Sequence, residues 1–380
     1  MKTESIGERE TRGLAVRTIS TMLLATGLVL PVYADGPAGP RNATVAQLRE
    51  MVANLEGKPD RDAAQALAGL ELTERLSDAQ RLPLEKGLVG PAAREALKML
   101  AEASAFNDLP QAEILGTPAP SRGEQAALLA KTREYVVQTL QKLPNFFATR
   151  ETENFQGTPK EAEHAEVRAK YEPLHAVSHS SVTVLYRNHR ETIVKGKKQA
   201  PSNQQMRTLG EFGPILDTVF GDAAKGRIYW SHWEQGAAGQ VAVFRYEVPE
   251  QQSHYQVSRT NIEQGDENDP GYHGEIAVDP SDGSILRVTV IAELKLDNPI
   301  TSANLAVDYG PVEIGGRTYI CPVKSVAVSD VRMVVQKLNF STGALESTSL
   351  GAPKNYLNKV EFKDYHLFRA EMRVLDLGSH

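Results

Sequence analysis

The stretch GYHGEIAVDPSDGSILRVTVIAEL, residues 271–294, decides the fold class. It predicts two strands joined by a turn at 279–283, because Pro280 fixes its own φ and Gly283 tolerates a positive φ. Alternate side chains share one apolar face, namely Ile276, Val278, Leu286, Val288, Val290 and Ala292. Polar side chains occupy the positions between them. One apolar face and one polar face are typical of an antiparallel sheet that covers a core or a cavity.

Further segments with this period-two alternation surround the hairpin and predict roughly ten or more antiparallel strands. They cover residues 181–196, 227–248, 253–260, 303–329 and 358–376. Gly315-Gly316 is a two-residue turn of the kind that hairpins prefer. One apolar helical segment, residues 210–222, interrupts the strands. We therefore expect residues 146–376 to form an antiparallel β domain, a curved sheet or incomplete barrel with a plugging helix.

Residues 35–145 predict a helical domain, which makes the expected fold class α+β. Apolar residues recur there at i, i+3 and i+4 between helix-capping signals. Asn42 is expected to cap the first helix, Pro59-Asp60 to open the second, and Pro91 to occupy the first turn of another. Ser121 and Glu124 have the spacing of a capping box.

The first 34 residues have the pattern of a secretory signal peptide. An uncharged segment from Thr18 to Ala34 follows Arg12 and Arg17, and it ends in Val32-Tyr33-Ala34. Cleavage is expected between Ala34 and Asp35, which would place the mature chain in the periplasm or outside the cell. A retained membrane anchor is the alternative, although the apolar run is shorter than the roughly 20 residues of a spanning helix.

Charge and motif content exclude several classes of function. The 380 residues carry a formal net charge of -6, which argues against a nucleic-acid partner. The lone Cys321 cannot form an internal disulfide and is expected to be a small core residue. The sequence has no nucleophile elbow, Walker loop, dinucleotide glycine pattern or zinc signature. We expect no enzyme activity and no cofactor, with an enzyme that has an unrecognised site as the lesser alternative.

Histidines and acids offer weak candidates for metal sites. His175 and His179 have helical metal-ligand spacing, but strand-like sequence follows them. Three histidines on predicted strands are interpreted as half-exposed sheet residues rather than metal ligands; they are His232, His254 and His273. Residues 263–269 are acidic but lack the spacing of an EF-hand, so they favour a solvated loop over a calcium site. No metal is therefore expected.

The apolar helix and an aromatic-rich hairpin predict a ligand cavity. The helix is apolar over much of its circumference, so it is expected to be buried on more than one side. It would suit the hollow of a curved sheet, next to the aromatic hairpin at 227–248. The candidate cavity residues are Phe212, Ile215, Leu216, Val219, Phe220, Trp230, Val288 and Val290.

Two segments carry a resemblance to a known family. They are GEIAVDPSDGSILRV at 274–288 and VDYGPVEIGGRTYICPV at 307–323. Residues 178–375 resemble the periplasmic lipoprotein-carrier fold, the LolA/LppX/RseB-like group. The resemblance implies an incomplete antiparallel barrel in which helices plug an apolar concavity, and a role in carrying lipoproteins or in binding or sensing lipids. The helical domain and an insertion at 333–358 depart from that family.

Three hypotheses about function follow. The first is a periplasmic, non-enzymatic protein that binds a lipid, an acyl chain or a lipidated partner in an apolar half-barrel cavity. The second is an envelope scaffold for protein–protein interaction, with a filled β domain and a helical region that binds the partner. The third is the enzyme with an unrecognised site. The sequence does not distinguish oligomeric states.

Overall fold

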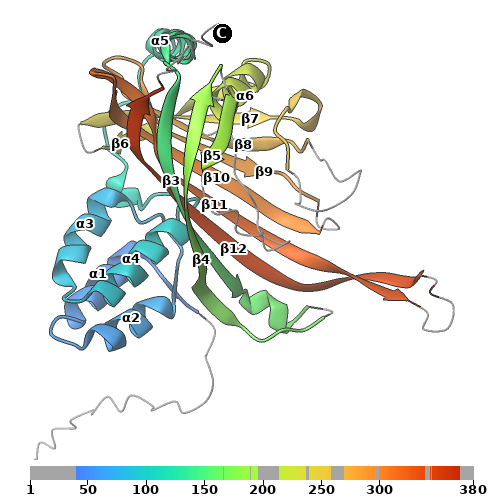
Figure 1. The fold of residues 1–380 in the computed structure, drawn as a ribbon. Helices are drawn as coiled ribbons and strands as arrows, with labels where there is room; N and C mark the ends of the chain where they lie inside the picture. Colours follow the sequence, from blue (N-terminus) through green and yellow to red (C-terminus); the bar gives the residue numbers. More distant parts are fainter. Residues whose placement is uncertain are drawn as a thin grey trace, which may run out of the picture. The chain divides into compact units, whose positions relative to one another are not determined.

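The computed structural model describes residues 40–165, 167–188, 190–195, 214–236, 239–257, 269–295, 299–338, 343 and 345–368. Within them the fold is α+β, as predicted. Helices precede a ten-stranded antiparallel sheet that does not close into a barrel (Figure 1). The expected signal peptide, its cleavage point after Ala34 and the candidate residue Phe212 lie outside the described residues.

Residues 40–103 form four α-helices with a core of their own. The elements are β1 (Arg41–Ala43), α1 (Val45–Asn54), α2 (Asp60–Ala68), β2 (Leu70–Leu72), α3 (Asp78–Gly87) and α4 (Pro91–Ala103). Leu48, Leu67 and Leu97 have no exposed surface and belong to one apolar cluster. Each helix turns its apolar stripe toward the others, as amphipathic spacing dictates. β1 and β2 pair as a short parallel bridge beside them.

The helix-start signals are confirmed at three places and wrong at one. Asp60 is the first residue of α2, and Pro59 immediately precedes it. Pro91 is the first residue of α4, and Ser121 with Glu124 forms a complete capping box at the start of α5 (Arg122–Lys142). Asn42 does not cap α1. Thr44 does, because its side chain accepts the backbone N–H of Gln47 while the Gln47 side chain closes the box.

The sheet takes up most of the remaining chain. Its strands are β3 (Phe146–Thr158), β4 (Glu172–Arg187), β5 (Arg190–Lys195), β6 (Arg227–Gln235), β7 (Gln240–Val248), β8 (Tyr272–Val278), β9 (Ile285–Ala292), β10 (Ile300–Ile314), β11 (Arg317–Leu338) and β12 (Leu345–Leu367). Their order is β5-β4-β3-β12-β11-β10-β9-β8-β7-β6. The last long strand, β12, therefore lies beside the first, β3, and joins the two halves of the sheet.

Short helices connect several of the larger elements. The 3₁₀ helices are η1 (Gln111–Glu113), η2 (Lys160–Glu163) and η3 (Glu250–Gln252), and the apolar segment forms α6 (Pro214–Ala223). The predicted hairpin turns are confirmed, because Gly283, Gly315 and Gly316 all have positive φ angles.

Two details of the strand prediction are wrong. Residues 253–257 form only an isolated bridge at Val257, because the backbone N–H of His254 is donated to Asp222 instead of to a strand. Leu286 does not share the apolar face of Val288. It packs with Val241, Val243 and Ala277 in a separate cluster, since the β8–β9 register shifts between Ala277 and Val278.

The predicted insertion at 333–358 is a continuation of two strands. β11 and β12 pair with one another from Lys324 and Glu361 to Leu338 and Leu345. β10 accompanies β11 only as far as Val331. The two strands project past their neighbours as a two-stranded ribbon (Figure 1).

The edge strand β6 is covered by the connection that leads to α5. The Leu115 N–H donates to the Trp233 carbonyl at 3.0 Å, and the Trp233 indole N–H donates to the Pro118 carbonyl at 3.0 Å. Ile114 forms an antiparallel bridge with Glu234. This connection protects backbone groups that an open sheet leaves unpaired at its edge.

A substitution at Gly274 tests how closely the backbones of β8 and β9 approach each other. A Cβ atom at this position would lie 1.9 Å from the Thr289 carbonyl oxygen, which is backbone. We expect Gly274→Ala to lower the free energy of unfolding by at least about 2 kcal/mol, measured by urea denaturation. Gly116→Ala is the matched control, because nothing lies within 4 Å of its Cβ. Equal stability of the two variants would contradict this account of the close approach.

Candidate functional site

Helices α5 and α6 pack on one face of the sheet and form its main core. The core takes alternate residues from neighbouring strands, for instance Phe244 and Tyr246 of β7, Ile276 of β8 and Val307 of β10. Seven of the eight candidate cavity residues are in or against this cluster. They are Ile215, Leu216, Val219 and Phe220 of α6, Trp230 of β6, and Val288 and Val290 of β9. The structure thus brings the predicted residues together.

The described interior is closely packed around these side chains. Val219 and Val290 have no exposed surface, and Val288 is 1% exposed. A side chain without exposed surface has no water-sized space beside it. An acyl chain would therefore enter by displacing α6, and the ligand-binding role of these residues stays a prediction.

A buried carboxylate ties the end of α6 to the sheet. Asp222 is 3% exposed and accepts three hydrogen bonds. The donors are the His254 backbone N–H at 2.8 Å, the His254 ring Nδ1 at 2.5 Å and the Tyr272 hydroxyl at 3.0 Å. Burial, and next the neighbouring Asp222 carboxylate, raise the pKa of Tyr272 far above its ordinary value. The hydroxyl therefore stays protonated and available as a donor.

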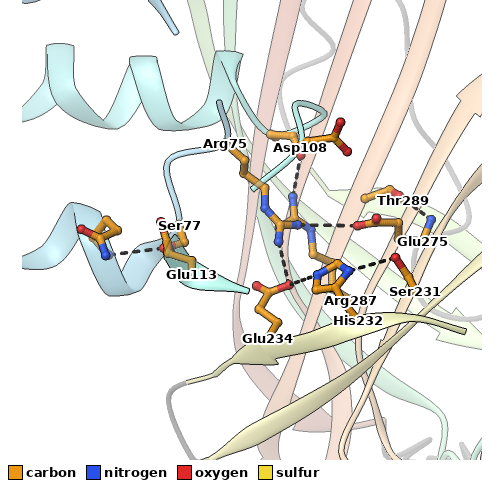
Figure 2. Close-up of polar contacts among 12 residues, drawn as sticks. Arg75, Ser77, Asp108, Glu113, Ser231, His232, Glu234, Glu275, Arg287 and Thr289 are labelled. Carbon is orange, nitrogen blue, oxygen red and sulfur yellow. Dashed lines mark hydrogen bonds and ion pairs between the residues drawn. The ribbon is translucent and has the colours of Figure 1, made fainter. Parts of the chain in front are cut away.

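The opposite face of the same strands, the polar face, carries a buried ion-pair network beside the small cluster of Val241, Val243 and Ala277. Arg245 lies between Phe244 and Tyr246 along β7, so it points away from α6. Arg75, which follows β2, is 5% exposed and pairs with Glu234 of β6 at 2.7 Å. Its second guanidinium nitrogen lies 4.0 Å from Glu275 of β8. Figure 2 shows the Arg75 guanidinium between the two carboxylates.

Further contacts fix the segment after α4 to this polar face. Arg245 donates to Asp108 at 2.7 Å and to Glu275 at 3.1 Å. Arg287 donates to the Ala105 carbonyl at 2.8 Å. Burial, and next the positive charge of Arg287, lower the pKa of Arg75. The carboxylates around Arg75 therefore stabilise its positive charge at a position from which water is excluded.

The histidines are divided among separate partners. His232 contacts the Ser231 hydroxyl at 2.9 Å and Glu234 at 3.9 Å, and burial lowers its pKa. His254 binds Asp222, and His273 lies 3.2 Å from Glu293. Within the described residues no group of three or more histidine, cysteine or acidic side chains could hold a metal ion.

Other sequence candidates occupy ordinary positions. His175 and His179 are on strand β4, not on a helix, and His175 lies 3.7 Å from Glu172. Cys321 is 1% exposed in a cluster with Phe146 and Tyr186, which confirms it as a core residue. Most of the acidic stretch 263–269 lies outside the described residues.

A groove of about 650 Å³ opens beside the ion-pair network. Its floor is the polar face of β6 to β9, and its wall is the 105–108 segment. Tyr229, Glu247, His273 and Glu293 lie on the floor with Arg245 and Glu275. No local pattern in the sequence indicates this groove, because residues distant in the chain build it.

Comparison with protein-family models, curated proteins and solved structures gives no match. No helix in the described part of the chain is long and apolar enough to cross a bilayer.

Arg75 provides the first test of the polar face. Arg75→Met leaves Glu234 without its arginine partner, while Glu275 keeps Arg245 at 3.1 Å. We therefore expect the free energy of unfolding to fall by about 3 kcal/mol. Arg227→Met is the control, because Arg227 pairs with Glu247 at 3.0 Å but is 75% exposed. Its loss should cost under about 1 kcal/mol. Urea denaturation measures both, and similar losses would contradict the burial argument.

Asp330 of β11 is expected to make the stability of the protein depend on pH. Burial, and next the charges of Glu161 and Glu71, raise its pKa to about 6. The folded protein thus holds this proton more tightly than the unfolded chain, and the stability gained below about pH 4 is lost as the pH rises past 6. Asp330→Asn should therefore be more stable than the wild type by about 1–2 kcal/mol at pH 8, with the gap closing at pH 4.

Urea denaturation at both pH values measures the Asp330 effect. The control is Glu313→Gln on β10, since Glu313 is exposed. It should change stability by under about 0.5 kcal/mol at either pH. A stabilisation by Asp330→Asn that is as large at pH 4 as at pH 8 would contradict the titration.

Proposed function

We propose that the protein is a non-enzymatic binding protein that takes the acyl chain of a lipid or lipidated partner between α6 and the open sheet. One observation carries the proposal. A short helix buries Ile215, Leu216, Val219 and Phe220 against an antiparallel sheet that does not close. The backbone ladder of the sheet does not include α6, so the helix can move away while the strands remain paired. The expected resemblance to lipoprotein carriers points to the same class of ligand.

The exchange of α6 for an acyl chain is close to balanced in free energy. Exposing four large apolar side chains costs about 6–12 kcal/mol, at about 1.5–3 kcal/mol each. Burying a chain of about 14 methylene groups returns about 11 kcal/mol. Binding would therefore be reversible, as carriage or sensing requires. The hydrogen bonds to Asp222 add to the cost of opening.

The packed interior favours a second candidate, the interaction scaffold. In that function α6 is a permanent part of the core, and the protein contacts a partner through its surface. The projecting ribbon supports this candidate, because Met333 is 45% exposed and Val335 is 48% exposed on β11.

The test of the proposed function is purification of the protein from a Gram-negative periplasm without detergent. Intact mass is measured before and after organic extraction. We expect an extractable lipid mass on the native protein. We also expect palmitate to shift the tryptophan emission of the extracted protein, because Trp230 and Trp233 both border the α6 core.

A pair of Tyr→Phe variants separates the two candidates. Tyr272→Phe removes one hydrogen bond to Asp222, so α6 should open more easily and palmitate uptake should be faster. Tyr229→Phe is the control, because that hydroxyl binds Glu247 on the opposite face. Absence of extractable lipid together with unchanged emission at saturating palmitate would contradict acyl binding and favour the scaffold.

A further inference from the structure

The groove on the polar face is separate from the α6 core and does not depend on the acyl-binding proposal. Its volume of about 650 Å³ lies within the range of sites for small molecules. Its floor and wall come from the sheet and the 105–108 segment, which the ion pairs of Arg245 and the contact of Arg287 hold in place. The concavity is therefore fixed by the fold.

The groove and its ion-pair network carry an excess of negative charge. The carboxylates are Asp108, Glu234, Glu247, Glu275 and Glu293, and the guanidinium groups that pair with them are Arg75, Arg227 and Arg245. Five carboxylates less three arginines leave two negative charges, and the neighbouring Arg287 is balanced by Asp308 at 3.7 Å. Glu293, 60% exposed, has an imidazole as its ion-pair partner, the His273 ring at 3.2 Å. An anionic ligand would be repelled here, whereas a cation would be attracted.

A second observation indicates that the ligand also carries a hydrogen-bond acceptor. Arg75 lines the groove and is 5% exposed. Its Nε–H is buried and has no hydrogen-bond partner among the described residues. A buried donor without an acceptor is unfavourable, so the guanidinium has unused donor capacity. A ligand oxygen that accepts from the part of Arg75 lining the groove would add a hydrogen bond to it. With the surrounding charge already negative, a neutral carbonyl or hydroxyl oxygen suits this position better than a carboxylate or phosphate.

We propose that the groove binds a small organic cation that also carries neutral oxygen acceptors. The ammonium or guanidinium group would lie near Glu247 and Glu293, and a carbonyl or hydroxyl oxygen would accept from Arg75. Tyr229 already holds a cation beside its ring, because the Arg227 guanidinium lies 5.7 Å from its centroid. An amino sugar and a short lysine-containing peptide both have this chemistry.

Calorimetric titration of the full chain at low salt tests the site. The probes are glucosamine and the tripeptide Gly-Lys-Gly with an acetylated N-terminus and an amidated C-terminus. Their uncharged counterparts are N-acetylglucosamine and Gly-Gly-Gly blocked in the same way. We expect one of the two cations to bind with at least tenfold higher affinity than its counterpart, and the stronger one identifies the source. The affinity should fall as salt is raised.

Two matched variants locate the binding. Glu293→Gln should lower the affinity for the cation by about tenfold. It should leave the melting temperature unchanged, since Glu293 is exposed at the rim. Glu172→Gln is the control, because Glu172 is also exposed beside an imidazole, that of His175, but lies outside the groove. Binding that is absent for both cations at 10 mM, or that is equal in Glu293→Gln and the wild type, overturns the proposal.

Discussion

An antiparallel sheet that remains open must cover its apolar face, and the rest of this structure follows from that constraint. Strands β6 to β11 of the ten-stranded sheet gather apolar side chains into one cluster on one side. Helices α5 and α6 cover this cluster, although they come from parts of the chain far apart in sequence. Helix α5 packs against the sheet and not against α1–α4 (Figure 1). The predicted helical region is thus shared between two cores.

The two faces of the sheet hold their helices by different forces. On one side, contacts between apolar side chains dominate, and these tolerate sliding because they have no preferred direction. On the other side, Arg75 and Arg245 bind individual carboxylates, and such pairs fix one orientation at little net gain in stability. The same strands therefore carry one helix that is held by non-directional apolar contacts and one helical group that is held by directional ion pairs. The acyl binding proposed for the apolar face would not require these ion pairs to break.

Local patterns predicted the elements of the fold well, and long-range contacts explain the failures. The hairpin turns and the capping box of Ser121 depend on a few adjacent residues, so the sequence was sufficient for them. Thr44 replaced Asn42 as the cap because the choice depends on where the bridge between β1 and β2 ends. The Arg75–Glu234 pair joins residues 159 positions apart, and no periodicity links them. The groove was not predicted for the same reason, because its lining residues are far apart in the sequence. The candidate cavity residues were predicted because the segment that forms α6 contains most of them.

The connection over β6 also determines how one molecule can meet another. Sheets of separate molecules fuse when an exposed edge strand accepts a strand from a neighbour, and this is a common start of aggregation. At β6 the backbone of Trp233 already bonds to Leu115 of the same chain. The chain thus terminates its own sheet on that side, and polymerisation through β6 would first require this intramolecular strap to detach.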